Sequence, residues 1–176
     1  MRRARRRTLL ALALLPVASP ALAEPASLYE LPLRFVDDGN RLRELSEWRG
    51  RAVVVTMAYG ACRSVCSTTL RTLEALQVEA DRHGIALDFI VASVDPAEDT
   101  PQDWAAWRHA RRLERSNWTF LSGTPEATRS LAQWLGIRLW RYDEHVMHDF
   151  RIVRLDAEGA ARAALDWHRR DLERML

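Results

Sequence analysis

The segment AVVVTMAYGACRSVCSTTL, residues 52–70, contains the transition that decides the fold. Its first part, Ala52–Met57, is a continuous apolar and β-branched run, typical of strands that are buried on both faces. After the two cysteines, apolar residues recur at helical spacing, at Leu70, Leu73, Leu76 and Ala80. Gly84 then stands where a helix would end. The segment therefore predicts a strand, a turn that carries cysteines, and a helix.

The rest of the chain continues the alternation of strands and helices. Strands are expected at 33–36, 42–45, 87–94, 118–121 and 137–140, and a final hairpin at 150–155 and 160–165. Thr100-Pro101 and Thr124-Pro125 predict two helix starts, and Gly136 predicts the end of the second helix. We expect residues 24–30 to be a loose leader, the piece with His145 and His148 to be irregular, and a C-terminal helix to follow Trp167.

These elements predict an α/β fold in which helices flank a mixed central sheet, with a C-terminal β-hairpin and helix. Thioredoxin-like folds have this architecture. Residues 24–176 contain no repeat and no linker long enough to divide them, and their length suits one domain. We therefore expect a single thioredoxin-like domain over residues 24–176.

Residues 1–23 have the form of a secretory signal peptide. Arginines precede the apolar run 9–15, and Ala21-Leu22-Ala23 provides a small-x-small cleavage site. The alternative is an uncleaved anchor that faces the periplasm, but the run is shorter than the roughly 20 apolar residues of a spanning helix. We expect a periplasmic protein that associates with a membrane only if the signal stays attached. The sequence leaves general secretion and twin-arginine export both open.

The charge of the chain depends on this leader. Removing its five arginines changes 26 basic and 24 acidic residues to 21 and 24, and the formal charge from +2 to −3. Every basic residue besides histidine is arginine, and no basic patch interleaved with aromatic residues occurs. The sequence therefore gives no reason to expect nucleic acid as a partner.

Cys62 and Cys66 are the only cysteines, and they lie at the expected strand-to-helix turn. The N-terminus of a helix favours thiolate over thiol, and thiolates both exchange with disulfides and bind copper. The pair therefore predicts either a redox couple or a soft-metal site. A purely structural disulfide is a weaker alternative, because so short a loop adds little stability.

A third ligand would separate metal binding from thiol exchange, and His148 is the best candidate. Two thiolates and an imidazole suit Cu(I) and can also hold Cu(II), whereas zinc usually takes a fourth ligand. His145 is an alternative ligand in the same piece of chain, and Met147 is soft enough to contact copper although it suits packing equally well. Asp95 and Asp99 follow an expected strand end and read as turn and cap residues.

Together these motifs resemble the Sco/SenC family of copper-binding cytochrome c oxidase assembly proteins. The resemblance covers most of residues 24–176: the cysteine pair with three residues between, the histidine 86 residues after Cys62, and the segments 94–101 and 117–123. It implies a thioredoxin-like fold, copper as the cofactor, and Cys62, Cys66 and His148 as the ligands. It also implies that the loop of Asp95 and Asp99 lies near the site.

The chain departs from the family pattern at two positions. Arg63 and Ser67 stand where relatives usually have proline after each cysteine. Without these prolines the turn is less constrained, and Arg63 adds a positive charge that favours the Cys62 thiolate.

Three functions follow from these features. The first is a periplasmic chaperone that delivers copper to a client subunit of a cytochrome c oxidase-like enzyme. The second is a metal-independent thiol:disulfide oxidoreductase that uses Cys62 and Cys66 as its catalytic redox pair, served by a periplasmic thiol reductant. The third is a thiol peroxidase on the same fold, which no further motif in the sequence supports.

Overall fold

The computed structural model of the chain describes residues 26–60, 65–143 and 145–176. The strands are β1 (Arg34–Asp37), β2 (Leu42–Glu44), β3 (Val53–Ala58), β4 (Asp88–Ser93), β5 (Trp118–Gly123), β6 (Leu139–Tyr142), β7 (His145–His148), β8 (Arg151–Leu155) and β9 (Ala161–Asp166). The helices are α1 (Val65–His83), α2 (Pro101–Ala110) and α3 (Pro125–Leu135), with short 3-10 helices η1 (Leu28–Glu30), η2 (Leu45–Trp48) and η3 (Leu172–Met175). The α/β class is thus confirmed.

Seven strands form a mixed sheet in the order β2-β1-β5-β4-β3-β8-β9, and β6 and β7 form a separate two-stranded sheet. The central strands β5, β4 and β3 are parallel, and β8 runs antiparallel to β3. Every residue of β3 and β4 is buried. Their continuous apolar runs therefore indicated the centre of the sheet correctly, since a strand covered on both faces has no polar side.

Threonine caps begin two of the helices as expected. The Thr100 hydroxyl accepts a hydrogen bond from the Asp103 backbone N–H, and the Asp103 carboxylate accepts one from the Thr100 N–H. Thr124 caps α3 in the same way through the Ala127 N–H, and Gly136 ends that helix in the left-handed region at φ 67°. These caps fix where α2 and α3 leave the sheet.

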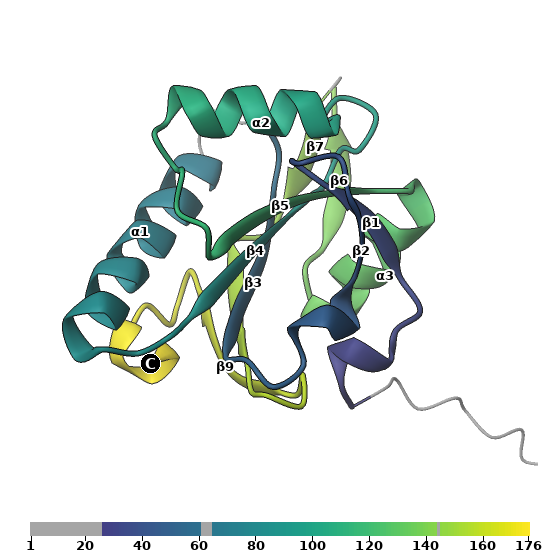
Figure 1. Ribbon diagram of the computed structural model, residues 1–176. Coiled ribbons are helices and arrows are strands. Elements are labelled where there is room, and N and C mark those ends of the chain that lie inside the picture. Colours follow the sequence, from purple (N-terminus) through teal and green to yellow (C-terminus); the bar gives the residue numbers. More distant parts are fainter. Residues whose placement is uncertain (1–25, 61–64, 144) are drawn as a thin grey trace, which may run out of the picture.

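Figure 1 shows α1 and α3 on either side of the central strands, while α2 crosses the end of the sheet at which β3 ends. The β6–β7 hairpin lies near the same end. Because β3, β4 and β5 are parallel, their carboxyl ends meet at this edge, where ligands of α/β proteins usually bind.

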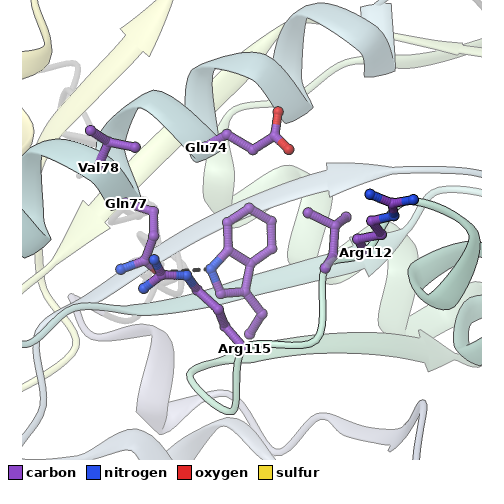
Figure 2. A pocket seen from close by; sticks show the side chains of 7 residues that line it. Glu74, Gln77, Val78, Arg112 and Arg115 are labelled. Carbon is purple, nitrogen blue, oxygen red and sulfur yellow. Dashed lines mark hydrogen bonds between the residues drawn. The ribbon is translucent and has the colours of Figure 1, made fainter.

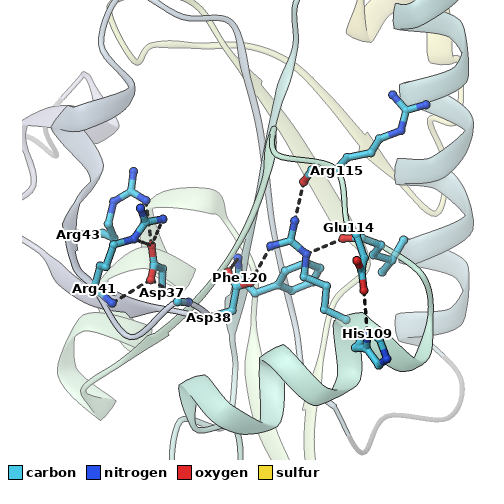
Figure 3. A network of polar contacts seen from close by, with 11 residues as sticks. Asp37, Asp38, Arg41, Arg43, His109, Glu114, Arg115 and Phe120 are labelled. Carbon is cyan, nitrogen blue, oxygen red and sulfur yellow. Dashed lines mark hydrogen bonds and ion pairs between the residues drawn. The ribbon is translucent and has the colours of Figure 1, made fainter.

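Arg108 links α2 to other parts of the domain, and Figure 3 labels two of its partners, Asp38 and Arg115. Its guanidinium donates hydrogen bonds to the Asp38 carboxylate at 2.6 Å and to the backbone oxygens of Leu113 and Arg115, both at 2.5 Å. Arg108 and Asp38 are both largely buried. This charge-assisted network ties the helix to the β1–β2 turn and so holds α2 in place over the edge of the sheet.

The structure corrects two expectations. The piece with His145 and His148 is not irregular, because it forms β7 and pairs with β6. Residues 28–30 are not a loose leader, since η1 buries Leu28 and Tyr29. The helix expected after Trp167 is the short 3-10 helix η3.

Across the described ranges, no helix combines the length and the apolar character needed to span a membrane.

Candidate metal centre

The predicted cysteine turn joins β3 to α1. β3 ends at Ala58, and Tyr59 and Gly60 extend the chain from its carboxyl end. Cys62 lies outside the described residues. Of Cys66 the structure gives the backbone position, which is the second residue of the 19-residue helix α1. The positive end of this long helix therefore points toward the turn, an environment that favours thiolate.

His148 reaches the same edge from the other end of the sequence. It ends β7, shortly before β8, whose Ile152 is the register partner of Thr56 in β3. The Thr56 hydroxyl also donates a hydrogen bond to the Arg151 backbone oxygen at 2.7 Å. The fold thus carries His148 to the carboxyl end of β3, although most of the sequence of the domain separates the two.

The His148 side chain is buried, with 3% of its surface exposed. Its ring lies edge-on to Tyr59, with the ring centroids 6.3 Å apart and an angle of 74° between the planes. Tyr59 follows β3 directly and precedes the cysteine turn. An imidazole held in this way is screened from water, unlike the solvated loop histidine that its polar sequence context would favour.

One hydrogen bond of His148 indicates which ring nitrogen carries the hydrogen in the neutral side chain. Its Nδ1 lies 2.9 Å from the backbone oxygen of Asp149. Because a carbonyl oxygen only accepts, Nδ1 must carry the hydrogen, so the lone pair of the neutral ring is on Nε2. Metal-bound histidines commonly donate their second nitrogen in this manner, so His148 fits the role of an imidazole ligand through Nε2.

Asp149, which provides that carbonyl, is itself held by Arg138. The Arg138 guanidinium donates to both carboxylate oxygens, with N–O distances of 2.8 and 3.0 Å, and the Arg138 backbone N–H donates to one of them at 3.1 Å. These bonds keep the pKa of the Asp149 carboxyl below its ordinary value. The ion pair fixes the backbone at the end of β7 and thereby the orientation of the His148 ring.

The alternative histidine, His145, faces the other way. Side chains alternate along a strand, so Val146 and His148 share one face of β7 and are buried, while His145 and Met147 share the other face. His145 is exposed and Met147 is half-buried. His145 and His148 therefore belong to opposite faces of the hairpin.

Asp99 links the loop after β4 to the chain before the cysteines. One carboxylate oxygen accepts a hydrogen bond from the Gly60 N–H at 2.9 Å, and the other accepts one from the Ser93 hydroxyl at 2.5 Å. The Asp99 backbone oxygen in turn accepts from the Ser122 hydroxyl in β5. A single residue thus connects the carboxyl ends of all three parallel strands next to Gly60, which precedes the cysteine segment in the chain.

Gly60 permits this contact. A Cβ atom at residue 60 would lie 3.1 Å from the Asp99 carboxylate, closer than side chains normally approach, and would contact the Trp107 ring at 3.4 Å. Asp99 is 3% exposed, and burial raises its pKa above the ordinary value, against the opposing effect of the hydrogen bonds from Ser93 and Gly60. Residue types alone predicted turn and cap roles for Asp95 and Asp99, and this missed the contact of Asp99 with Gly60, whereas the family resemblance had implied that their loop lies near the site. The Asp95 backbone oxygen accepts hydrogen bonds from the Glu98 and Asp99 N–H groups, so Asp95 does begin a turn.

Tyr59 was also missed by sequence reasoning. The available signal was its position between the end of a buried strand and the cysteines, where α/β proteins place functional side chains. Nothing in the local sequence of Tyr59, however, indicates that its neighbour in space is His148.

A pocket of about 230 Å³ lies away from this edge (Figure 2). It is lined by Glu74, Gln77, Val78, Arg112, Leu113, Arg115 and Trp118. Gln77 is held in the wall of the pocket, because its side-chain oxygen accepts hydrogen bonds from the Trp118 indole N–H and the Asn117 amide, both at 2.8 Å. The pocket lies at the amino end of β5, the opposite end of the strand from the cysteine turn, and it does not belong to the candidate centre.

Comparisons with known proteins identify the family of the chain. A model of the SCO1/SenC family matches residues 23–175. A protein of Stutzerimonas stutzeri that is named for copper binding is 29% identical over an alignment of 147 residues, and the alignment covers 75% of this chain and 70% of that protein.

Solved structures of similar fold include two Sco proteins. Arabidopsis thaliana ScoI with copper bound superposes with a TM-score of 0.71 at 17% identity, over 81% of this chain and 90% of that one. Yeast Sco1 superposes with a TM-score of 0.69 at 18% identity, over 82% of this chain and 90% of that one. These structures confirm the predicted thioredoxin-like fold, with its mixed sheet flanked by helices. With the family model matching nearly all of the domain, the chain belongs to the SCO1/SenC family.

Proposed function

We propose that this protein is an exported copper chaperone that binds one copper ion through Cys62, Cys66 and His148. The observation that carries the proposal is the placement of His148. It is buried at the carboxyl end of β3, against Tyr59, with Nδ1 committed to a backbone oxygen. β3 ends before the cysteine-bearing segment and α1 follows it, which supports a position for the two thiols near this edge of the sheet.

The chemistry of these donors suits copper. Two thiolates and an imidazole are a soft, three-coordinate set, which favours Cu(I) and can also hold Cu(II). The N-terminus of α1 and Arg63 favour the thiolate form that binds metal. Copper-bound structures of Arabidopsis ScoI and yeast Sco1, which share the fold, support copper as the metal.

We further propose that the copper is delivered to a client subunit of a cytochrome c oxidase-like enzyme in the periplasm, after removal of residues 1–23. BsSco, which has the same fold, is described as a member of the Sco family of cytochrome c oxidase assembly proteins. The signal-like leader of this chain supports export.

A Cu(I) competition titration of reduced residues 24–176 against a chromophoric chelator tests the proposal. The expected result is tight binding of a single ion that weakens about 100-fold or more in His148→Ala, since a buried ligand is lost. His168→Ala is the matched control, because it removes an exposed imidazole that lies outside the β6–β7 hairpin. Equal affinities for the wild type and His148→Ala would overturn the three-ligand site.

The second candidate is a thiol:disulfide oxidoreductase that acts through Cys62 and Cys66 without metal. The position of the cysteine turn at the N-terminus of α1 favours it, because the same electrostatics activate a thiol for exchange. Reduction of a disulfide substrate at equal rates by the wild type and His148→Ala, together with weak copper binding in both, would move this function into first place.

A further inference from the structure

The β6–β7 hairpin has two faces of different character. Leu139 and Arg141 pair with His148 and Val146, while Trp140 and Tyr142 pair with Met147 and His145. Since side chains alternate along a strand, Trp140, Tyr142, His145 and Met147 share the face opposite His148. We call these four residues the outer hairpin face.

The outer hairpin face gathers soft and aromatic groups at the surface. Trp140 is 43% exposed and Tyr142 is 73% exposed, while His145 is exposed and Met147 is half-buried. The other two methionines of the described chain, Met57 and Met175, are 1% and 0% exposed. Met147 is thus the one thioether within the described ranges that solvent can reach, and an imidazole lies two residues away on the same face.

The spacing of His145 and Met147 suits a shared ion. Residues i and i+2 of a strand are about 7 Å apart at their Cα atoms, and both side chains are long enough to converge on a point between them. Thioether sulfur and imidazole nitrogen are donors that favour Cu(I). A hard cation such as Mg²⁺ would instead require a cage of oxygen ligands.

Trp140 adds a third contribution from the neighbouring strand. It is the direct register partner of Met147, so their Cβ atoms are about 4.5–5.5 Å apart. A cation bound at the Met147 sulfur is then within reach of the indole ring, whose face attracts cations at distances up to about 6 Å. Two ligands and a ring make a weaker site than two thiolates and an imidazole, so an ion can leave it readily.

We propose that the outer hairpin face is a second, weaker Cu(I) site, with Met147 and His145 as ligands and Trp140 as an aromatic cover. The site lies on the opposite side of β7 from His148. Binding at this face does not require Cys62, Cys66 or His148. Its use as the place where copper is first received, before transfer to the centre, rests on the proposed function.

The test uses a Cys62→Ser/Cys66→Ser variant of residues 24–176 with ¹³C-methyl methionine, titrated with Ag(I) as a soft, redox-stable monovalent probe and followed by NMR. The Met147 methyl signal is expected to shift and to saturate near one equivalent. The buried Met57 and Met175 methyls act as internal controls and remain in place. The fragment lacks Met1, so a fourth methyl signal can come only from an initiator methionine added for expression. The signal that disappears in Met147→Leu is that of Met147.

Three variants on this background assign the roles. His145→Ala is expected to weaken Ag(I) binding about tenfold or more, and Trp140→Leu about two- to tenfold. His168→Ala removes an exposed imidazole outside the hairpin and leaves the binding unchanged. Circular dichroism of each variant establishes that the domain is folded.

Two outcomes would overturn the proposal. One is a Met147 signal that does not shift at millimolar Ag(I). The other is a shift that His145→Ala and His168→Ala affect equally, which would indicate nonspecific binding. Because the cysteines are absent, failure of the main centre to bind copper leaves this titration intact, and the two failures are distinguishable.

Discussion

The ring of Tyr59 contacts the ring of His148 edge-on, with centroids 6.3 Å apart, and this contact joins the end of β3 to the end of β7. The two residues come from distant parts of the sequence. Tyr59 lies three residues before Cys62, so the contact connects the proposed imidazole ligand to the segment that carries the proposed thiolates. Tyr59 is therefore a positioning residue for the centre.

Replacing Tyr59 tests this role. Tyr59→Leu is expected to lower the Cu(I) affinity about two- to tenfold, because an aromatic pair contributes about 0.5–1.5 kcal/mol that holds the imidazole in place. Tyr59→Phe keeps the ring and is expected to retain more of the affinity. Chelator competition measures both variants, and a larger loss in Tyr59→Phe than in Tyr59→Leu would contradict a role of the ring.

The hydrogen bond from His148 to the Asp149 oxygen predicts an unusual tautomer. In the neutral, metal-free protein His148 should carry its proton on Nδ1, whereas exposed histidines such as His168 should mostly carry it on Nε2. Long-range ¹H–¹⁵N NMR distinguishes the two nitrogens by their chemical shifts. A protonated Nε2 on neutral His148 would contradict the hydrogen bond from Nδ1 to the Asp149 oxygen.

The main elements of the fold were predictable because their signals are local. The β-branched runs of β3 and β4 are buried on both faces, and Thr100, Thr124 and Gly136 mark helix ends by hydrogen bonds to neighbouring residues. Such patterns need no knowledge of the tertiary structure.

The β6–β7 hairpin was missed because its local signals are weak. Its connection lacks the Asn-Gly or Asp-Gly pair typical of tight hairpins, and Asp143 instead adopts φ 57° without a glycine beside it. The alternation of His145, Val146, Met147 and His148 was present, but polar residues on both faces concealed it. The expected strand at 137–140 was accordingly placed two residues too early.

The helix η1 was missed for a different reason. The Ser27 hydroxyl donates to the Glu158 backbone oxygen at 2.6 Å, and the Leu28 N–H donates to the Gly159 oxygen at 2.9 Å. These partners are 131 residues away in the sequence, so the order of the segment depends on tertiary contacts. The contact of Asp99 with Gly60 was unpredictable on the same ground.

Asp99 should affect both stability and the centre. Asp99→Ala leaves the Gly60 N–H and the Ser93 hydroxyl without their acceptor, so we expect a loss of about 2–3 kcal/mol in the free energy of unfolding. Asp99→Asn can still accept from the Gly60 N–H through its amide oxygen, and its NH₂ group can donate to the Ser93 hydroxyl oxygen, so this change should be milder. Thermal unfolding measures stability, and the pH dependence of thiol alkylation measures the acidity of the cysteine thiols. A shift in thiol acidity in Asp99→Ala that Asp99→Asn rescues would indicate positioning of the turn.

The raised pKa of Asp99 also gives a pH dependence of defined sign. Its pKa is higher in the folded than in the unfolded chain, so the folded state binds more protons between the two values. The contribution of Asp99 to stability is therefore full below the unfolded pKa and is lost as the pH rises through the folded pKa. Asp99→Asn has no carboxyl group at this position, so this pH-dependent contribution to the free energy of unfolding is absent from the variant. Chemical denaturation of both proteins across the acidic range tests it, and identical pH profiles would contradict the raised pKa.

Gln77 offers a control for every change at the candidate centre, because it stabilises the domain at the opposite end of β5. Its side-chain oxygen accepts from the buried Trp118 indole and from Asn117, so Gln77→Ala should lower the free energy of unfolding by about 1–3 kcal/mol. The Cu(I) affinity of the folded variant should stay within about twofold of the wild type, since no described contact joins Gln77 to His148 or Gly60. A parallel fall in stability and affinity would mean that copper binding reports global stability, and the effects of Tyr59→Leu and Asp99→Ala would then lose their local interpretation.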